Sequence, residues 1–378
     1  MLKIDKKLQN FVILSEKACV FECIVYYNNK FKTMKFLEKN KIKILCDLNF
    51  INAYAVCCNS AEILMSSRQS FISFISSVAN VFSLINVSKK IIGVDYCYGK
   101  GKDITVAYID TGINSHIDFT LGHNRIIKFV DFVNGYDRCY DDNGHGTFVA
   151  GVSAGNGIFS CGLYAGIAPM SNIISLKALN GKGEATAVKI LEAMQWVYDN
   201  HKKYNIKVVC MSFGSEPLGV NDPIMIAAES LWQEGITMVC AGGNSGPEMQ
   251  TIKSPGISKK IITVGGLDDK RDGEGNYNEK DFDVANFSSR GPAFGKIKPD
   301  IIAPSVNIVS CCSKGGYSKM SGTSVAAPIV AGVCALIYEK YPNVTPNQIK
   351  KFLLLNAKDI KKSKFSQGYG IINLLNNF

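Results

Sequence analysis

The first 87 residues carry short apolar runs whose period changes from strand-like to helix-like and back. Residues 18–26, "ACVFECIVY", predict a strand, and residues 31–40 place apolar side chains near one face of a helix. The following runs predict two strands, a helix and a last strand, over residues 41–48, 52–59, 60–76 and 77–85. The order β-α-β-β-α-β is that of a small ferredoxin-like α+β domain, which we assign to residues 1–87.

From residue 88 onward the pattern changes, because apolar strands now alternate with amphipathic helices. Strand-like runs include "ITVAYI", "IISLKAL", "KVVCMSF", "ITMVCAGG" and "KIITVGG", with helical stretches such as residues 186–204 and 222–235 between them. This alternation is typical of an α/β fold with a mostly parallel central sheet and helices on both faces. Residues 88–378 therefore predict one large domain, whose functional residues belong at the carboxyl ends of strands.

Composition limits the cellular setting. The 378 residues contain no apolar run of the ~18 residues that a membrane helix needs, and we see no secretory signal at the start. The 13 cysteines are odd in number and include no C-x-x-C, which favours reduced thiols. We therefore expect a cytoplasmic protein that binds no membrane.

The positive charge is unevenly spread. Residues 1–90 hold 13 Lys and Arg against 6 Asp and Glu, so +7 of the net +10 lies in this segment. Because no arginine-rich run with interleaved aromatic residues occurs, we do not expect nucleic-acid binding. A solvated basic surface on the N-terminal segment is the simpler interpretation.

Three residues outside this segment suggest nucleophilic catalysis. Asp110 ends the apolar run "VAYI", where a carboxylate is costly to bury unless another group binds it. His145 lies between two glycines in "NGHGTFVAG". Each has a simpler alternative, since Asp110 could cap a turn and His145 could be structural.

Ser324 is the fourth residue of the stretch "SGTSVAAPIVAG", residues 321–332, and lies at the entrance of its small-residue apolar run. Pro328 is tolerated only in the first turn of a helix, which places Ser324 at a helix N-terminus, where developing negative charge is favoured. An N-cap serine is the alternative. The order Asp, His, Ser along the chain is nevertheless that of one of the convergent catalytic triads. In that arrangement His145 would be the base for Ser324, and Asp110 would orient the imidazole.

A tetrahedral oxyanion also needs donors that are already in place. Asn244, on the glycine-lined loop "CAGGNSGP", is one candidate, and the backbone N–H of Ser324 is the second. A turn asparagine is the alternative for Asn244.

Together these segments resemble the subtilase family, the subtilisin-like serine proteases. "YIDTGIN", "GHGTFVAG", "AGGNSGP" and "GTSVAAPIVAG" are similar to the family's Asp, His, oxyanion-Asn and Ser motifs, and occur in the family's order. The match runs from about residue 92 to the C-terminus, and "RIIKFVDFVNGYDRCYDDNGHGT" looks most like the intracellular bacterial branch. The resemblance implies a serine endopeptidase that cleaves protein or peptide substrates.

The resemblance also implies a role for the N-terminal domain. Subtilase prodomains resemble a ferredoxin-like fold, assist folding and block the active site until they are cleaved. We therefore expect residues 1–87 to be an intramolecular inhibitor and the chain to be a self-processing zymogen. A cationic cover on a less basic catalytic domain fits the charge distribution.

Substrate-binding residues follow from the same resemblance. "MSFGSEP" matches the family's strand beside the specificity pocket, so Ser212, Phe213 and Gly214 are expected to bind substrate backbone and wall the pocket. Ala241 and Gly242 would form the opposite wall. Lys253 stands at the pocket floor, where relatives often have glycine. It would favour an acidic or polar side chain before the cut, unless it turns to solvent.

The resemblance implies that no cofactor is needed for the chemistry. Asp118 matches a family aspartate that can bind structural calcium, although the rest of the usual calcium loop is not recognisable in residues 153–166. His116 and Asp118 alone are too few ligands to indicate a metal hydrolase. The remaining rival is a non-catalytic regulator on a protease fold, which Asp110, His145, Ser324 and Asn244 disfavour because all are present.

Overall fold

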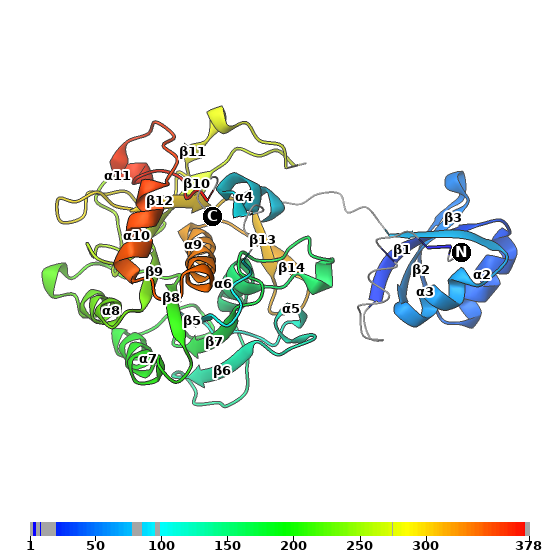
Figure 1. The fold of residues 1–378 in the computed structure, drawn as a ribbon, viewed down its shortest axis with the longest axis horizontal. Coiled ribbons are helices and arrows are strands. Elements are labelled where there is room, and N and C mark those ends of the chain that lie inside the picture. The colour runs from blue at the N-terminus through cyan, green and yellow to red at the C-terminus, as the bar shows by residue number, and fades with distance from the viewer. Residues whose placement is uncertain are drawn as a thin grey trace. The chain divides into compact units, whose positions relative to one another are not determined.

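The computed structural model describes residues 3, 4, 8, 20–77, 85–94, 99–273 and 275–374. They belong to two compact units, residues 1–81 and 82–378 (Figure 1). The division falls shortly before the boundary predicted after residue 87. Each unit has its own hydrophobic core.

The N-terminal unit is a four-stranded antiparallel sheet with the strand order β2-β3-β1-β4. Asn29 and Asn59 each cap a helix by accepting a hydrogen bond from a backbone N–H group in its first turn. The element order β-α-β-β-α-β agrees with the expected ferredoxin-like arrangement. Its elements are β1 (Val20–Tyr27), α2 (Lys30–Lys39), β2 (Lys43–Leu48), η1 (Asn49–Ile51), β3 (Ala53–Asn59), α3 (Ser60–Ser67) and β4 (Ile72–Ser77).

The predicted bounds at the end of this unit were wrong. The helix expected over residues 60–76 ends at Ser67, and residues 72–77 form β4 against β1. Ile72 and Ile75 are both buried, a spacing of three that suggests a helix. The strand accommodates it because the β1–β4 register shifts at Tyr26/Tyr27, as a β-bulge does. Of the strand expected over residues 77–85, residues 78–84 lie outside the described residues.

The second unit is built on an eight-stranded sheet with the order β11-β10-β9-β8-β5-β7-β6, in which β12 also pairs with β10. The pairs are parallel except β10–β11. The expected mostly parallel α/β fold is therefore confirmed. The strands are β5 (Thr105–Asp110), β6 (Ile126–Asp131), β7 (Asn172–Lys177), β8 (Ile206–Met211), β9 (Thr237–Ala241), β10 (Ile262–Asp268), β11 (Asp283–Val284) and β12 (Ile301–Pro304), with the separate hairpin β13 (Ile308–Cys311) and β14 (Tyr317–Met320).

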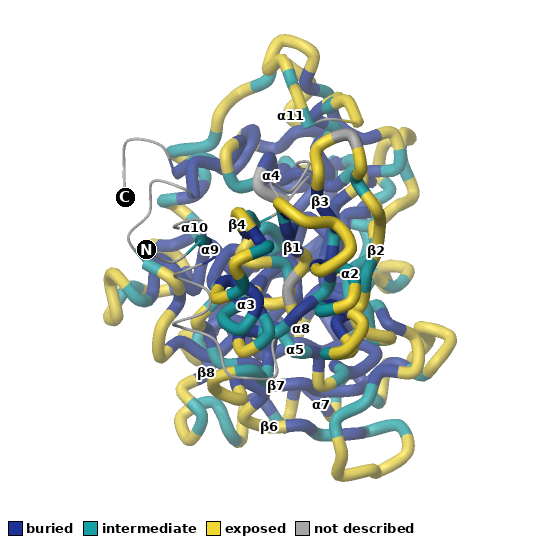
Figure 2. Tube along the Cα trace, turned by 90° about the vertical axis from the view of Figure 1, so that its right-hand side faces the viewer, coloured by how far each residue is buried: buried dark blue, intermediate teal, exposed yellow. Residues whose placement is uncertain are grey.

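Helices cover this sheet. The pair α6 and α9 packs together, and α9 crosses β8, β9 and β10, while the pair α7 and α8 contacts β5 and β9. Figure 2 shows buried positions along β7 and β8 and exposed positions in connecting loops. The helices are α4 (Ile85–Ile92), α5 (Ile117–Thr120), α6 (His145–Ala154), α7 (Ala187–Asn200), α8 (Pro223–Gln233), α9 (Thr323–Lys340), α10 (Pro346–Leu355) and α11 (Lys364–Gln367), with 3-10 turns η3 (Ile158–Ser160), η4 (Gly219–Asn221) and η5 (Glu279–Asp281).

Helix α9 is the central element of the core. No continuous apolar run of membrane-spanning length marks it in the sequence, because polar residues stand at both ends. By length and mean hydropathy its 18 residues could nevertheless cross a membrane, but 83% of the helix is buried inside the fold. Small residues let neighbouring segments approach closely. A Cβ added at Gly332 would lie 2.6 Å from Cβ of Ile167. The helix therefore packs as a core element whose N-terminus is fixed relative to the sheet.

We expect Gly332→Val to lower the free energy of unfolding by about 1–3 kcal/mol, because a larger side chain overpacks the contact with Ile167. Urea unfolding measures the change. Gly273→Val is the matched control, since no heavy atom lies within 4 Å of a Cβ at Gly273. Equal unfolding midpoints for the two variants would contradict the described packing.

Candidate active site

The carboxyl ends of the central strands bring the predicted residues to one edge of the sheet. Asp110 is the last residue of β5, Ser212 directly follows β8, and Ala241 ends β9. His145 begins α6, and Ser324 is the second residue of α9. Since α6 and α9 pack against one another, distant parts of the sequence supply one region of the fold (Figure 1).

Asp110 and His145 form a close pair. The Nδ1 atom of His145 lies 2.7 Å from Oδ1 of Asp110. The backbone N–H of Thr111 donates to the same oxygen at 2.7 Å. Because the carboxylate accepts, the Nδ1 atom carries the proton, and Nε2 is left as the basic nitrogen. The Asp110 side chain is 3% exposed and that of His145 is 25% exposed, so the pair is shielded while the imidazole still reaches the surface.

The pKa of His145 lies above its ordinary value. Burial is the largest influence and lowers the pKa, but the charge of Asp110, its hydrogen bond and the charge of Asp141 together outweigh burial. The imidazolium is therefore stabilised relative to the same group in water. A general base that must take up a proton benefits from this stabilisation.

A buried carboxylate that sequence reasoning missed holds the start of α6 in place. Asp141 accepts hydrogen bonds from the backbone N–H groups of Gly144 (2.7 Å) and Thr147 (2.9 Å) and from the hydroxyl of Thr111 (2.9 Å). Thr111 in turn accepts from the N–H of Gly146 at 2.9 Å. Asp141 thus joins the end of β5 to the N-terminus of α6, where a carboxylate is electrostatically favoured.

Gly146, which follows His145, lies where α6 and β5 come too close together for any side chain. A Cβ at Gly146 would lie 2.1 Å from the carbonyl oxygen of Gly112 and 3.2 Å from Cβ of Asp110. Any side chain there would push α6 away from β5. Gly146 therefore allows the 2.7 Å contact between His145 and Asp110.

Lys177 is a second residue that sequence reasoning missed. Its side chain is fully buried at the end of β7, and its ammonium donates to the carbonyl of Thr111 (2.6 Å), the carbonyl of Leu179 (3.1 Å) and Oδ1 of Asp142 (2.6 Å). A buried charge needs such partners. Lys177 therefore fixes the turn that follows Asp110.

The side-chain amide of Asn244 is oriented by α9. Its Oδ1 atom accepts from both the backbone N–H and the hydroxyl of Thr323, each at 2.9 Å. With the oxygen engaged, the Nδ2 donors face the other way. A Cβ added at Gly322 would lie 3.2 Å from this nitrogen and 3.1 Å from Oγ of Ser324. Both atoms therefore border the same small space.

Ser324 and His145 are not hydrogen-bonded to each other among the described residues. The hydrogen bond recorded for the His145 ring joins its Nδ1 atom to Asp110. Catalytic hydrogen bonds are often long before substrate binds and shorten in the complex, so the missing hydrogen bond does not exclude a proton transfer between them.

A cavity of about 260 Å³ adjoins Ser324 and Asn244. Its lining includes the predicted Ser212, Phe213, Gly214, Ala241 and Lys253, together with Gly243, Ser245 and Thr323. Gly242 does not line it. Its backbone is engaged behind the wall, where the N–H donates to Val264 and the carbonyl accepts from Lys253. Gly243 takes its place at the surface of the cavity.

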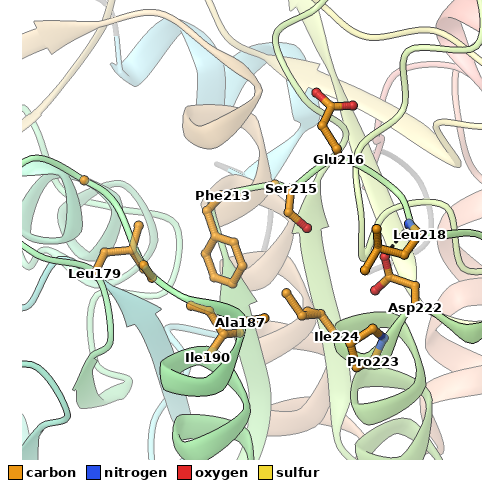
Figure 3. A pocket seen from close by; sticks show the side chains of 13 residues that line it. Leu179, Ala187, Ile190, Phe213, Ser215, Glu216, Leu218, Asp222, Pro223 and Ile224 are labelled. Atoms are coloured by element: carbon orange, nitrogen blue, oxygen red, sulfur yellow. Dashed lines mark hydrogen bonds between the residues drawn. The ribbon is translucent and has the colours of Figure 1, made fainter.

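A second cavity, of about 220 Å³, was not predicted from the sequence (Figure 3). Its floor is apolar, and Phe213 and Gly214 belong to both cavities. Figure 3 shows the ring of Phe213, which follows β8, pointing toward Ala187 and Ile190 in the first turn of α7. Phe213 is more than twenty positions from Ala187 and Ile190 in the sequence, so no local motif indicates the cavity.

The surroundings of Asp118 do not fit calcium. Its carboxylate accepts from the N–H of Phe159 (3.0 Å), the hydroxyl of Tyr317 (2.8 Å) and the thiol of Cys311 (3.6 Å). Burial, followed by the charge of Asp118, raises the pKa of both Tyr317 and Cys311, so both groups keep their protons. Calcium requires several oxygen acceptors, whereas donors surround this carboxylate.

His116 completes this cluster without offering a free ligand atom. Its Nδ1 accepts from the backbone N–H of Asp118 at 3.1 Å, and its Nε2 therefore donates to the carbonyl of Gly316 at 2.9 Å. His116, Asp118 and Cys311 lie close enough to hold a metal ion, yet each is already hydrogen-bonded. The cluster is best explained as a hydrogen-bonded core that ties α5 to the β13–β14 hairpin.

Comparisons with known proteins agree with this geometry. The model of the Subtilase family, Peptidase_S8, matches residues 101–370. The chain is 40% identical over 370 residues to "Serine protease AprX" of Bacillus subtilis (strain 168), covering 88% of this chain and 80% of the relative. It is 32% identical over 278 residues to "Subtilisin DY" of Bacillus licheniformis, covering 73% and 90%.

Solved structures show the same fold. "Sphericase" superposes with a TM-score of 0.64 at 28% identity, over 76% of this chain and 97% of that one. "S41 Psychrophilic Protease" gives a TM-score of 0.62 at 29% identity, over 75% and 97%.

The Asp110–His145 pair makes a prediction about titration. We expect the pKa of His145 to lie above 6.5 and to fall in Asp110→Asn, because the charge that stabilises the imidazolium is removed. The stability linked to this group is present at low pH and is lost as pH rises through the raised pKa. NMR titration of the His145 ring in the Ser324→Ala background measures the pKa.

His201, the half-buried C-cap residue of α7, is the internal control for that titration. An unchanged pKa for His145 in Asp110→Asn would show that the carboxylate does not stabilise the imidazolium.

Proposed function

The chain belongs to the subtilase family and is a subtilisin-like serine endopeptidase. We propose that its Asp110, His145 and Ser324 hydrolyse peptide bonds through an acyl-enzyme. The observation that carries this proposal is the 2.7 Å contact between Nδ1 of His145 and the buried carboxylate of Asp110. It leaves Nε2 free to act as a base at the same edge of the sheet as Ser324.

In the first step, Oγ of Ser324 attacks the carbonyl carbon of the scissile bond while Nε2 of His145 takes its proton. The imidazolium that forms is stabilised by Asp110, which keeps its own charge. His145 then returns the proton to the leaving amine. In the second step, water attacks the acyl-enzyme with the same base, and Ser324 is released with its proton restored.

The oxyanion of each tetrahedral intermediate would be held by two donors. One is Nδ2 of Asn244, whose orientation is supported by the two hydrogen bonds from Thr323 to Oδ1. The other is the backbone N–H of Ser324 in the first turn of α9, where intrahelical acceptors are lacking. Donors that are already oriented stabilise the transition state without reorganising.

The two cavities would accept two side chains of an extended protein or peptide substrate. Ser212, Phe213 and Gly214 would bind its backbone at the end of β8. The cavity beside Ser324 would take the side chain before the cut, between the segments of Gly214 and Ala241, with Gly242 behind the wall. The second cavity would take an apolar side chain farther from the cut, because Leu179, Ile190 and Ile224 line it.

We also propose that the N-terminal unit is a prodomain that inhibits the peptidase unit until it is cleaved. Support comes from its separate core and ferredoxin-like element order, and from the match of the family model to residues 101–370, which lies entirely outside it. Its excess of basic residues would favour docking on a less basic partner. The whole chain is then a self-processing zymogen.

The same proposal locates the protein in the cytoplasm and assigns it no cofactor. No disulfide joins two cysteines of the described residues, which fits a reducing compartment. The chemistry above uses side chains and water alone. Structural calcium at Asp118, which the resemblance left open, is not part of the proposal because donors surround its carboxylate.

The role of Asn244 is tested by Asn244→Leu. We expect kcat on a neutral peptide to fall about 10²–10³-fold, the loss found when one oxyanion donor is removed from a subtilisin, with little change in KM. Steady-state kinetics on the mature enzyme measures both constants. A change confined to KM would indicate that Asn244 binds substrate but does not stabilise the transition state.

Self-processing is tested by intact-mass spectrometry of the purified full chain over time. We expect the wild type to lose its N-terminal unit and Ser324→Ala to stay at full length, because cleavage requires the nucleophile. Adding mature wild type to Ser324→Ala then separates cleavage within a molecule from cleavage between molecules. A full-length wild type that still hydrolyses peptides would reject the prodomain proposal alone.

A further inference from the structure

Lys253, which lines the cavity beside Ser324, is paired with the carboxylate of Glu216, which lines the second cavity. The ammonium of Lys253 forms an ion pair with Oε1 of Glu216. Ser215 and Ser254, the neighbours of this pair, exchange backbone hydrogen bonds of 3.0 and 2.9 Å as an antiparallel bridge. Residues 216 and 253 therefore lie opposite one another, where cross-strand side chains meet.

The stem of Lys253 has little freedom. A Cβ at Gly214 would lie 2.6 Å from Cβ of Lys253, and one at Gly243 would lie 2.6 Å from its Cγ. The methylene groups of Lys253 thus fill the space that these two glycines leave open. Its backbone N–H is also held, by the carbonyl of Gly242 at 3.0 Å. Movement is left to the end of the side chain.

The two partners differ in exposure. The Lys253 side chain is 19% exposed, whereas that of Glu216 is 82% exposed. Figure 3 shows Glu216 at the rim of the second cavity, with its carboxylate directed away from the apolar side chains below it. The fixed member of the pair is therefore the lysine, and the member that solvent or a ligand can displace is the glutamate.

We propose that Glu216 is a specificity-determining residue that competes with an acidic substrate side chain for Lys253. This inference rests on the proposed function, because it concerns the side chain before the scissile bond. A neutral side chain can pack on the Lys253 methylenes and leave the ion pair intact. A carboxylate must displace Glu216 before it gains the ammonium. In the wild type the lysine's charge is thereby masked, and an acidic preference is suppressed.

The readout is the ratio of kcat/KM for two peptides that are identical except for Glu or Gln before the cut. The two side chains have the same shape, so the ratio reports charge alone. We expect this ratio to rise at least about threefold in Glu216→Gln, which frees Lys253, as is typical of one accessible ion pair. It should return to the wild-type ratio in the double variant Glu216→Gln/Lys253→Met. High salt should reduce the gain, because the interaction is electrostatic.

Glu248→Gln is the matched control. It removes the same charge from the exposed loop between Asn244 and Lys253, so a change in net charge alone would shift both variants equally. We expect no change in the ratio for Glu248→Gln. A ratio that is unchanged in Glu216→Gln, or that rises equally in Glu248→Gln, would overturn the proposal.

A third peptide, with Phe before the cut, separates this inference from the proposed function. If the wild type cuts the Phe peptide but Glu216→Gln leaves the Glu/Gln ratio unchanged, Glu216 does not set specificity and the peptidase proposal stands. If the wild type, freed of its N-terminal unit, cuts none of the three peptides while Ser324→Ala behaves identically, the proposed function fails and this inference falls with it.

Discussion

The contact between Asp110 and His145 is the constraint on which the rest of the site depends. A carboxylate buried at the end of β5 is costly unless hydrogen bonds and an opposite charge compensate for lost hydration. Two donors share Oδ1, one from the His145 ring and one from the backbone of Thr111. The other oxygen, Oδ2, is buried without a hydrogen-bond partner in the described protein. The carboxylate is therefore poised to stabilise a positive charge on the imidazole.

That contact requires an exact backbone arrangement around it. Asp141 ties the start of α6 to Thr111, and Lys177 holds the turn after Asp110 from the neighbouring strand β7. Gly146 allows the helix and strand to approach. On the other side, Thr323 orients Asn244 at the start of α9. Buried polar residues thus position His145 and Asn244, and the apolar core holds α6 and α9 against the sheet.

The sequence was sufficient to predict the features that depend on local residue patterns. Alternating apolar strands and helices predicted the parallel sheet, and Asp110, His145, Asn244 and Ser324 stood in short motifs with turn glycines. The prediction failed where the deciding interaction is not local. The helix expected over residues 60–76 is divided because residues 72–77 pair with β1, and a bulge lets Ile72 and Ile75 both reach the core.

Long-range pairs within the site were equally hidden. In the sequence, Lys177 is indistinguishable from any other polar strand residue, although its side chain is fully buried and donates to the carbonyl of Thr111. Lys253 suggested a free positive charge at the pocket floor, and its partner Glu216 lies 37 residues earlier in the chain. Asp118 suggested calcium because it matches a family aspartate that can bind that ion, but its carboxylate accepts a hydrogen bond from the hydroxyl of Tyr317, 199 residues later in the chain. Such pairs are set by the tertiary fold and cannot be predicted from the neighbouring residues in the sequence.

The central claim is that His145, stabilised by Asp110, makes Ser324 a nucleophile. The most direct measurement is covalent labelling of the mature enzyme with a fluorophosphonate, followed by mass spectrometry of its peptides. The account predicts a single phosphonylated site at Ser324, formed rapidly in the wild type and at least about a hundredfold more slowly in His145→Ala, where the general base is lost. Labelling of Ser324 at equal rates in both proteins, or labelling of another serine instead, would contradict it.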